Sequence, residues 1–202
     1  MLDLKSFARE VVSALDEHLS KRGVVSQLAA GAAFEAWLAF EARLVMEHSR
    51  ARFGLDRRRD GAESRPWLVN ERRKVDLFIG EDDGCLIPIE FKLVFNNKNW
   101  ATQVEGIAAD LMPAKGSKKA GLKPMLGRVA IVGLVGKTYG DSTGYPGMRA
   151  DLTRWEAEVW EKLRRETRRK RLYAAVGHRH RLNHEWLEGA RSFFQLHAFT
   201  QP

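Results

Sequence analysis

The chain has 202 residues, of which 44% are hydrophobic and 30% are charged, a composition typical of one globular domain and not of collagen-like, disordered or disulfide-stabilised proteins. Lys and Arg outnumber Asp and Glu by 34 to 26, an excess of positive charge that favours polyanionic partners, with nucleic acid first. Cys85 is the only cysteine, the first residues lack the apolar run of a signal peptide, and no run approaches the length of a membrane span. We therefore expect a protein of the reducing cytoplasm with no membrane partner.

Two amphipathic helices are predicted at the start of the chain. Apolar residues at i, i+3, i+4, i+7 spacing predict a first helix that ends before Gly23. A second apolar stripe predicts a long helix that begins after Ser26, its N-cap, and runs through Phe53, with Gly54 ending the pattern. The arginine-rich stretch 56–65 has no apolar periodicity and is expected to form a mobile basic loop.

Strands dominate the middle of the chain. Three strand-like runs at 66–69, 74–80 and 85–95 are followed by a helix over 99–112, an apolar strand at 128–136, a long basic helix from Asp151 to Tyr173, and a strand at 191–199. The turn sequence at 81–84 joins the second and third runs, which predicts a β-meander. We see no domain boundary and expect residues 1–202 to form a single α/β domain, with a core at about 26–135 and an extension at 150–200.

Three charged residues stand within the apolar strands. Glu90 and Lys92 are two residues apart and share one face of their strand, and we expect Asp76, in the preceding strand, to face the same place. Charges among apolar residues cost free energy unless they are paired, and a divalent cation would relieve the repulsion between two carboxylates. Hard oxygen ligands suit Mg²⁺ or Mn²⁺. The alternative is an Asp76 exposed to solvent and a surface ion pair between Glu90 and Lys92.

The order α, β, β, β, α, β over residues 26–135, together with Asp76, Glu90, Phe91 and Lys92, resembles the PD-(D/E)xK nuclease superfamily, whose fold is called restriction-endonuclease-like. The resemblance implies an endonuclease that hydrolyses phosphodiester bonds in DNA with Mg²⁺, for which Mn²⁺ can substitute, and leaves 5′-phosphate and 3′-hydroxyl ends. It implies that Asp76, Glu90 and the backbone carbonyl of Phe91 bind the metal and that Lys92 is catalytic.

The sequence departs from the family pattern before Asp76, where Val75 stands in place of the frequent proline. The first helix of the family commonly supplies a further glutamate, and Glu35 matches that position, with Glu41 as the alternative. Gln103 matches a position where subfamilies carry a glutamine or a basic residue that faces the site. A solvated helix residue is the alternative interpretation of Gln103.

Basic residues outside this core are candidates for DNA contact. Lys98 precedes the helix at 99–112, and the basic helix carries Arg164, Arg168 and Arg171. A solvated charged face is the alternative interpretation of that helix. Duplex cleavage needs two active sites, which a homodimer would supply. The alternative function is a catalytically idle nuclease-like module that binds nucleic acid or protein, although no acid or lysine of the motif is missing.

Two further patterns are weaker. Residues 133–138 end like a phosphate-binding loop, but Ile131 stands where the first glycine of that motif is needed. His178, His180 and His184 lack a carboxylate or cysteine at ligand spacing, so we expect surface histidines there.

Overall fold

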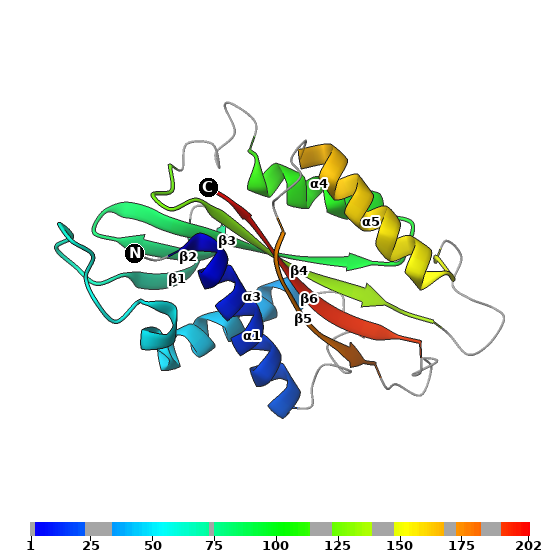
Figure 1. Cartoon of the computed structure of the whole chain (residues 1–202), viewed down its shortest axis with the longest axis horizontal. Coiled ribbons are helices and arrows are strands. Elements are labelled where there is room, and N and C mark those ends of the chain that lie inside the picture. Colours follow the sequence, from blue (N-terminus) through cyan, green and yellow to red (C-terminus); the bar gives the residue numbers. More distant parts are fainter. Residues whose placement is uncertain are drawn as a thin grey trace.

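One mixed sheet between two pairs of helices forms the framework of the protein (Figure 1). The computed structural model describes residues 3–22, 34–72, 75–113, 123–138, 148–167, 173–182 and 191–202. The helices are α1 (Leu4–Arg22), α3 (Phe34–His48), the 3₁₀ helix η1 (Arg50–Phe53), α4 (Trp100–Leu111) and α5 (Leu152–Thr167). The strands are β1 (Trp67–Arg72), β2 (Val75–Glu81), β3 (Gly84–Phe95), β4 (Arg128–Gly136), β5 (Tyr173–Arg181) and β6 (Phe193–Gln201). The prediction of an α/β protein is confirmed at this level.

The six strands lie in the order β1-β2-β3-β4-β6-β5. β3 and β4 are parallel, and every other neighbouring pair is antiparallel. The predicted β-meander is present as β1, β2 and β3. A parallel connection requires a crossover, and α4 provides it between β3 and β4.

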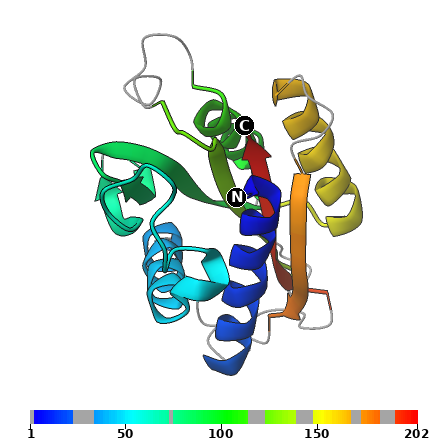
Figure 2. The same cartoon turned by 60° about the vertical axis from the view of Figure 1, so that its left-hand side comes forward.

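Helices cover both faces of the sheet, which explains why β4 is buried at every position. α1 and α3 pack on one face, and α4 and α5 lie together on the other (Figure 1, Figure 2). Alternate β3 residues face these two layers, so Phe91 and Leu93 join the α1–α3 core, whereas Val94 joins Val104 in the α4–α5 core. No helix in the described part of the chain has the length and the hydrophobicity needed to cross a bilayer.

The second predicted helix is shorter than expected. α3 ends at His48, and the chain then tightens into η1, so the prediction of one continuous α-helix through Phe53 is wrong. Gly54 follows η1 with a φ of 66°, a left-handed conformation that glycine adopts without a Cβ penalty. Ser26 lies outside the described residues.

The long basic C-terminal helix is not present among the described residues. α5 ends at Thr167, and Tyr173 already begins β5, so the prediction of a helix to Tyr173 is wrong. The apolar stripe of α5 ends with Leu163 and the buried Thr167, and the sequence Arg-Arg-Lys-Arg at 168–171 does not continue the apolar pattern. Arg168 and Arg171 lie outside the described residues.

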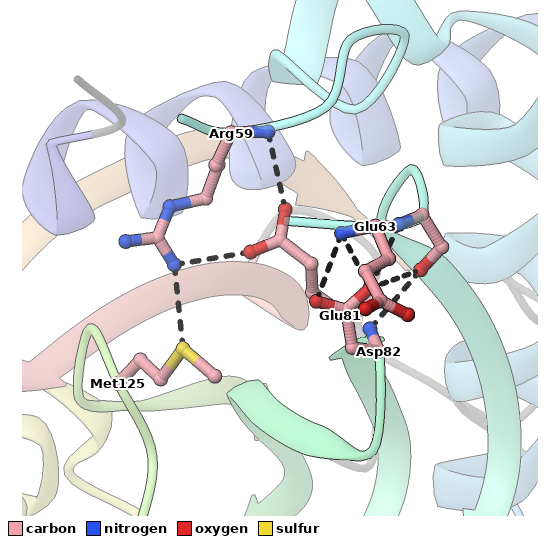
Figure 3. Close-up of polar contacts among 6 residues, drawn as sticks. Arg59, Glu63, Glu81, Asp82 and Met125 are labelled. Carbon is pink, nitrogen blue, oxygen red and sulfur yellow. Dashed lines mark hydrogen bonds and ion pairs between the residues drawn. The ribbon is translucent and has the colours of Figure 1, made fainter. Parts of the chain in front are cut away.

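Side-chain contacts anchor the arginine-rich segment that we expected to be mobile (Figure 3). Arg59 Nη1 lies 3.2 Å from Glu81 Oε2 at the end of β2. The Asp82 carboxylate accepts hydrogen bonds from the backbone N–H groups of Glu63 and Ser64, and these bonds lower the pKa of Asp82. The segment is therefore tied to the β2–β3 turn.

Candidate functional site

The candidate site lies where β3 extends beyond its neighbour β2. Leu77 of β2 pairs with Ile89 of β3, and β2 begins at Val75. β3 continues to Phe95 and pairs there with β4 along its other edge. No described strand covers the remaining edge of β3, so its backbone N–H groups need other partners.

Side-chain oxygens from three different elements accept hydrogen bonds from those backbone N–H groups. The acceptor and donor pairs are Asp76 Oδ2 with Phe91, Glu35 Oε1 with Leu93, and Gln103 Oε1 with Phe95, at 2.8, 2.8 and 3.1 Å. The donors alternate along β3 because every second N–H of a strand points toward the same edge. We call this edge of β3 the open edge. Asp76 of β2, Glu35 of α3 and Gln103 of α4 all bind to it.

Glu90 and Lys92 lie on the face of β3 that α4 covers. Because Leu77 pairs with Ile89, the same register places Asp76 across from Glu90. Glu90 is 3% exposed, and the Lys92 side chain is 25% exposed. Asp76, Glu90 and Lys92 are thus on one face of two neighbouring strands.

Lys92 lies between two carboxylates that come from opposite layers. Its Nζ is 3.7 Å from Glu35 Oε2 of α3 and 3.7 Å from Asp110 Oδ2 of α4. Glu35 therefore uses one oxygen for the backbone of β3 and directs the other toward Lys92. Both distances exceed the length of a hydrogen bond, so these are ion pairs without a direct hydrogen bond.

Two charged residues that the sequence pattern did not predict, Asp110 and Arg128, also lie at this site. Asp110 interacts electrostatically with the buried Arg128 at the start of β4, as does Glu90. Burial lowers the pKa of Arg128, whereas the charges of Cys85, Glu90 and Asp110 act in the opposite direction. One signal was available: Asp110 is seven residues after Gln103 in α4, so both share a helix face.

Of the two candidate glutamates in α3, Glu35 reaches the open edge of β3. Glu41 is 2% exposed, and its carboxylate lies 2.5 Å from His18 Nε2 of α1. Glu41 therefore links α1 to α3 within one layer. Its partner is His18 and not Lys92.

The carboxylates near the open edge fit a Mg²⁺ ion that keeps part of its water shell. Within the described ranges, no three His, Cys, Asp or Glu side chains gather as a metal-binding group. Asp76 and Glu90 nevertheless offer two carboxylates, and the Phe91 carbonyl could add a third oxygen. Mg²⁺ usually takes one or two carboxylates together with water and phosphate oxygens, so this donor set suits it.

Two of the predicted DNA-contacting residues, Lys98 and Arg164, are exposed on the surface. Lys98 lies just before α4, and Arg164 lies near the end of α5. The expectation of surface histidines is wrong for His180, whose Nε2 lies 2.8 Å from Oδ1 of the buried Asp16. His184 lies outside the described residues.

Comparisons of the chain with models of protein families, with curated proteins and with solved structures give no match. A function is therefore inferred from the residues and the geometry of this chain.

Proposed function

We propose that this protein is a Mg²⁺-dependent endonuclease that hydrolyses phosphodiester bonds in DNA. The observation that carries the proposal is the placement of Asp76, Glu90 and Lys92 on one face, at an edge where β3 extends beyond β2. The order α3, β1, β2, β3, α4, β4, with β3 parallel to β4, supports the restriction-endonuclease-like fold of the PD-(D/E)xK superfamily.

The charges around the open edge support a bound cation. The site contains four carboxylates and two cations. The carboxylates are those of Glu35, Asp76, Glu90 and Asp110, and the cations are Lys92 and Arg128. The formal charge is therefore −2 when all six groups are ionised. Negative charges that are close together in a half-buried site repel one another. One Mg²⁺ ion would neutralise the group.

Each residue has a defined part in the proposed reaction. Asp76, Glu90 and the Phe91 carbonyl would hold Mg²⁺ or Mn²⁺, which when bound stabilises negative charge on the phosphate and activates water. The Lys92 ammonium would hold the attacking water or stabilise the charge that develops on the phosphate. Glu35 orients Lys92, and Gln103 fixes the end of β3 through the Phe95 N–H.

DNA is the proposed substrate because the whole chain carries a formal net charge of +8 although the site itself is acidic. Lys98, Arg164, Arg168 and Arg171 are the proposed contacts to the DNA backbone. Cleavage of both strands of a duplex would bring two copies of the chain together as a homodimer. We place this activity in the cytoplasm, as expected for a chain with one cysteine.

A second candidate function has an observation in its favour. Asp76, Glu35 and Gln103 each accept a backbone N–H of β3, so these side chains already stabilise an uncovered strand edge. A nuclease-like module that binds nucleic acid without cleaving it could retain them for that reason. Cleavage measurements separate the two functions.

The test is DNA cleavage by the purified protein with Mg²⁺, with Mn²⁺ and with chelator. Supercoiled plasmid, linear duplex, single-stranded and branched DNA would identify the substrate. Asp76→Asn, Glu90→Gln and Lys92→Met should each reduce the cleavage rate by about 10²- to 10³-fold, the usual cost of losing one transition-state contact. Asp76→Asn is preferred to alanine because its amide oxygen can still accept the Phe91 N–H.

Asp83→Asn is the matched control, since it makes the same chemical change at an exposed position of the β2–β3 turn. It should cleave at the rate of the wild-type protein. If the wild type binds DNA and cleaves none of the substrates with either metal, the idle binding module replaces the nuclease. If Asp76→Asn cleaves as fast as Asp83→Asn, the proposed site is wrong.

A further inference from the structure

Lys92 is held at equal distances from two carboxylates. The distances from Nζ to Glu35 Oε2 and to Asp110 Oδ2 are both 3.7 Å. α3 and α4 cover opposite faces of the sheet, so the two carboxylates reach the ammonium from different layers of the protein. Lys92 makes no hydrogen bond to the other described side chains, which leaves its N–H groups available to a third acceptor.

Asp110 has an unusual place for a carboxylate. It lies on the side of α4 that faces the sheet, three residues after the buried Ile107, and its side chain is 12% exposed. A carboxylate in such a place costs free energy unless cations accompany it. Two do: Lys92 through the ion pair, and Arg128 through its electrostatic interaction.

Removing Asp110 would leave Lys92 with one carboxylate in reach. Opposite charges attract more strongly as they approach, so the ammonium would move toward Glu35 and close a direct ion pair. Its N–H groups would then be used by Glu35 and turned toward the α3 layer. Asp76 and Glu90 lie on the α4 face, so Lys92 would move away from them.

We propose that Asp110 is a positioning residue for Lys92: it balances the attraction of Glu35 and keeps the Lys92 ammonium directed toward the phosphate that is held beside Asp76 and Glu90. This inference rests on the proposed nuclease function and deepens it. Asp110 touches neither the metal nor the substrate, and it acts through Lys92. Losing such a contact displaces the reacting groups, which typically costs about 10- to 100-fold in rate.

A double-mutant cycle tests this role. Single-turnover cleavage is measured for the wild type, Asp110→Asn, Lys92→Met and the double variant, with Asp83→Asn as control. Asp110→Asn should lower the cleavage rate constant about 10- to 100-fold and leave the DNA affinity in chelator within about twofold of the wild-type value. In the Lys92→Met background the same substitution should change the rate less than about twofold, because its target is gone.

Asp110→Glu is a second variant that keeps the charge on α4. It should retain more activity than Asp110→Asn, even if both variants have equal melting temperatures. A purely structural carboxylate would instead give equal losses with and without Lys92, and that result would overturn the inference. An unchanged rate in a folded Asp110→Asn protein would also overturn it. A wild type that cleaves no substrate refutes the nuclease function itself, whereas additive losses in an active enzyme refute only the role of Asp110.

Discussion

At the scale of single residues, the carboxylates of Asp76 and Glu35 each have two oxygens that can serve different partners. Each uses one oxygen to accept a backbone N–H of β3, and a carboxylate has a second oxygen that can serve another partner. For Glu35 that partner is Lys92. Asp76 has no ion pair with a cation among the described side chains, so in the proposed nuclease its second oxygen would be free to bind the metal.

His197 supplies a test of stability that is independent of the site. It is buried beneath Trp160, with ring centroids 4.5 Å apart. Burial lowers the pKa of His197 from 6.5 to about 4, and the charge of Arg179 acts in the same direction. The folded protein thus keeps this imidazole neutral at pH values where the unfolded chain binds a proton.

The free energy of unfolding should therefore fall as the pH drops below about 6.5, by about 2 kcal/mol from this group between pH 7 and pH 5. His197→Phe keeps a ring under Trp160 and removes the titration, so its stability should fall less over the same range. Urea unfolding of both proteins at the two pH values measures the difference. Equal losses in the two proteins would show that His197 does not stay neutral in the fold.

At the scale of elements, the strands and helices that could be predicted from the sequence are those with a clear apolar pattern. The strands of the meander and β4 are strongly apolar, and they were predicted within a few residues of their bounds. β5 could not be delimited from the sequence, where a basic strand and a loop were both possible, because residues between His178 and Arg181 are basic and polar. Its position depends on pairing with β6 and on contacts such as Arg179 over the Phe193 ring at 3.5 Å. Such long-range contacts leave no local pattern.

The proposed DNA contact at the C-terminal end of α5 can be tested by reversing one charge. Arg164 is exposed near its C-terminal end, and Arg154 is exposed near its start, where it pairs with Glu158. If the C-terminal end contacts DNA, Arg164→Glu should weaken binding at low salt and reduce the slope of log K against log salt by about 1, the share of one phosphate contact. Arg154→Glu makes the same charge change as a control.

Binding to a short duplex in chelator, followed at several salt concentrations, measures both quantities. Arg154→Glu should lower the affinity less and leave the slope unchanged. An equal effect of both variants would mean that the net charge of the protein, and not this end of α5, determines binding.

At the scale of the whole molecule, the site is built from both helix layers and the sheet, whose side chains come together at the open edge of β3. The sequence predicted Asp76, Glu90 and Lys92 as one group because period-two alternation and neighbouring strands are local features. Asp110 and Arg128 could not be placed in the same way, since their proximity depends on how α4 packs over β3 and β4. Two of the six charged residues around the site are thus placed there by tertiary packing that the sequence pattern does not reveal.

The net charge of −2 at this edge gives the last prediction. A cation that binds only the folded state stabilises it, by about 2.7 kcal/mol at a hundredfold excess over Kd. For a domain of this size that amounts to a melting shift of several degrees. Mn²⁺ should therefore raise the melting temperature of the wild type until the site is saturated.

Asp76→Asn should lose most of that gain, whereas Asp83→Asn should keep it. In chelator, Asp76→Asn should melt at or above the wild-type temperature, because the substitution removes one of the repelling charges and keeps an acceptor for the Phe91 N–H. Thermal melts of the three proteins with Mn²⁺ and with chelator measure both effects. If Asp76→Asn melts lower in chelator and Mn²⁺ shifts none of the proteins, the carboxylates only stabilise the strand edge, and a metal site there is excluded.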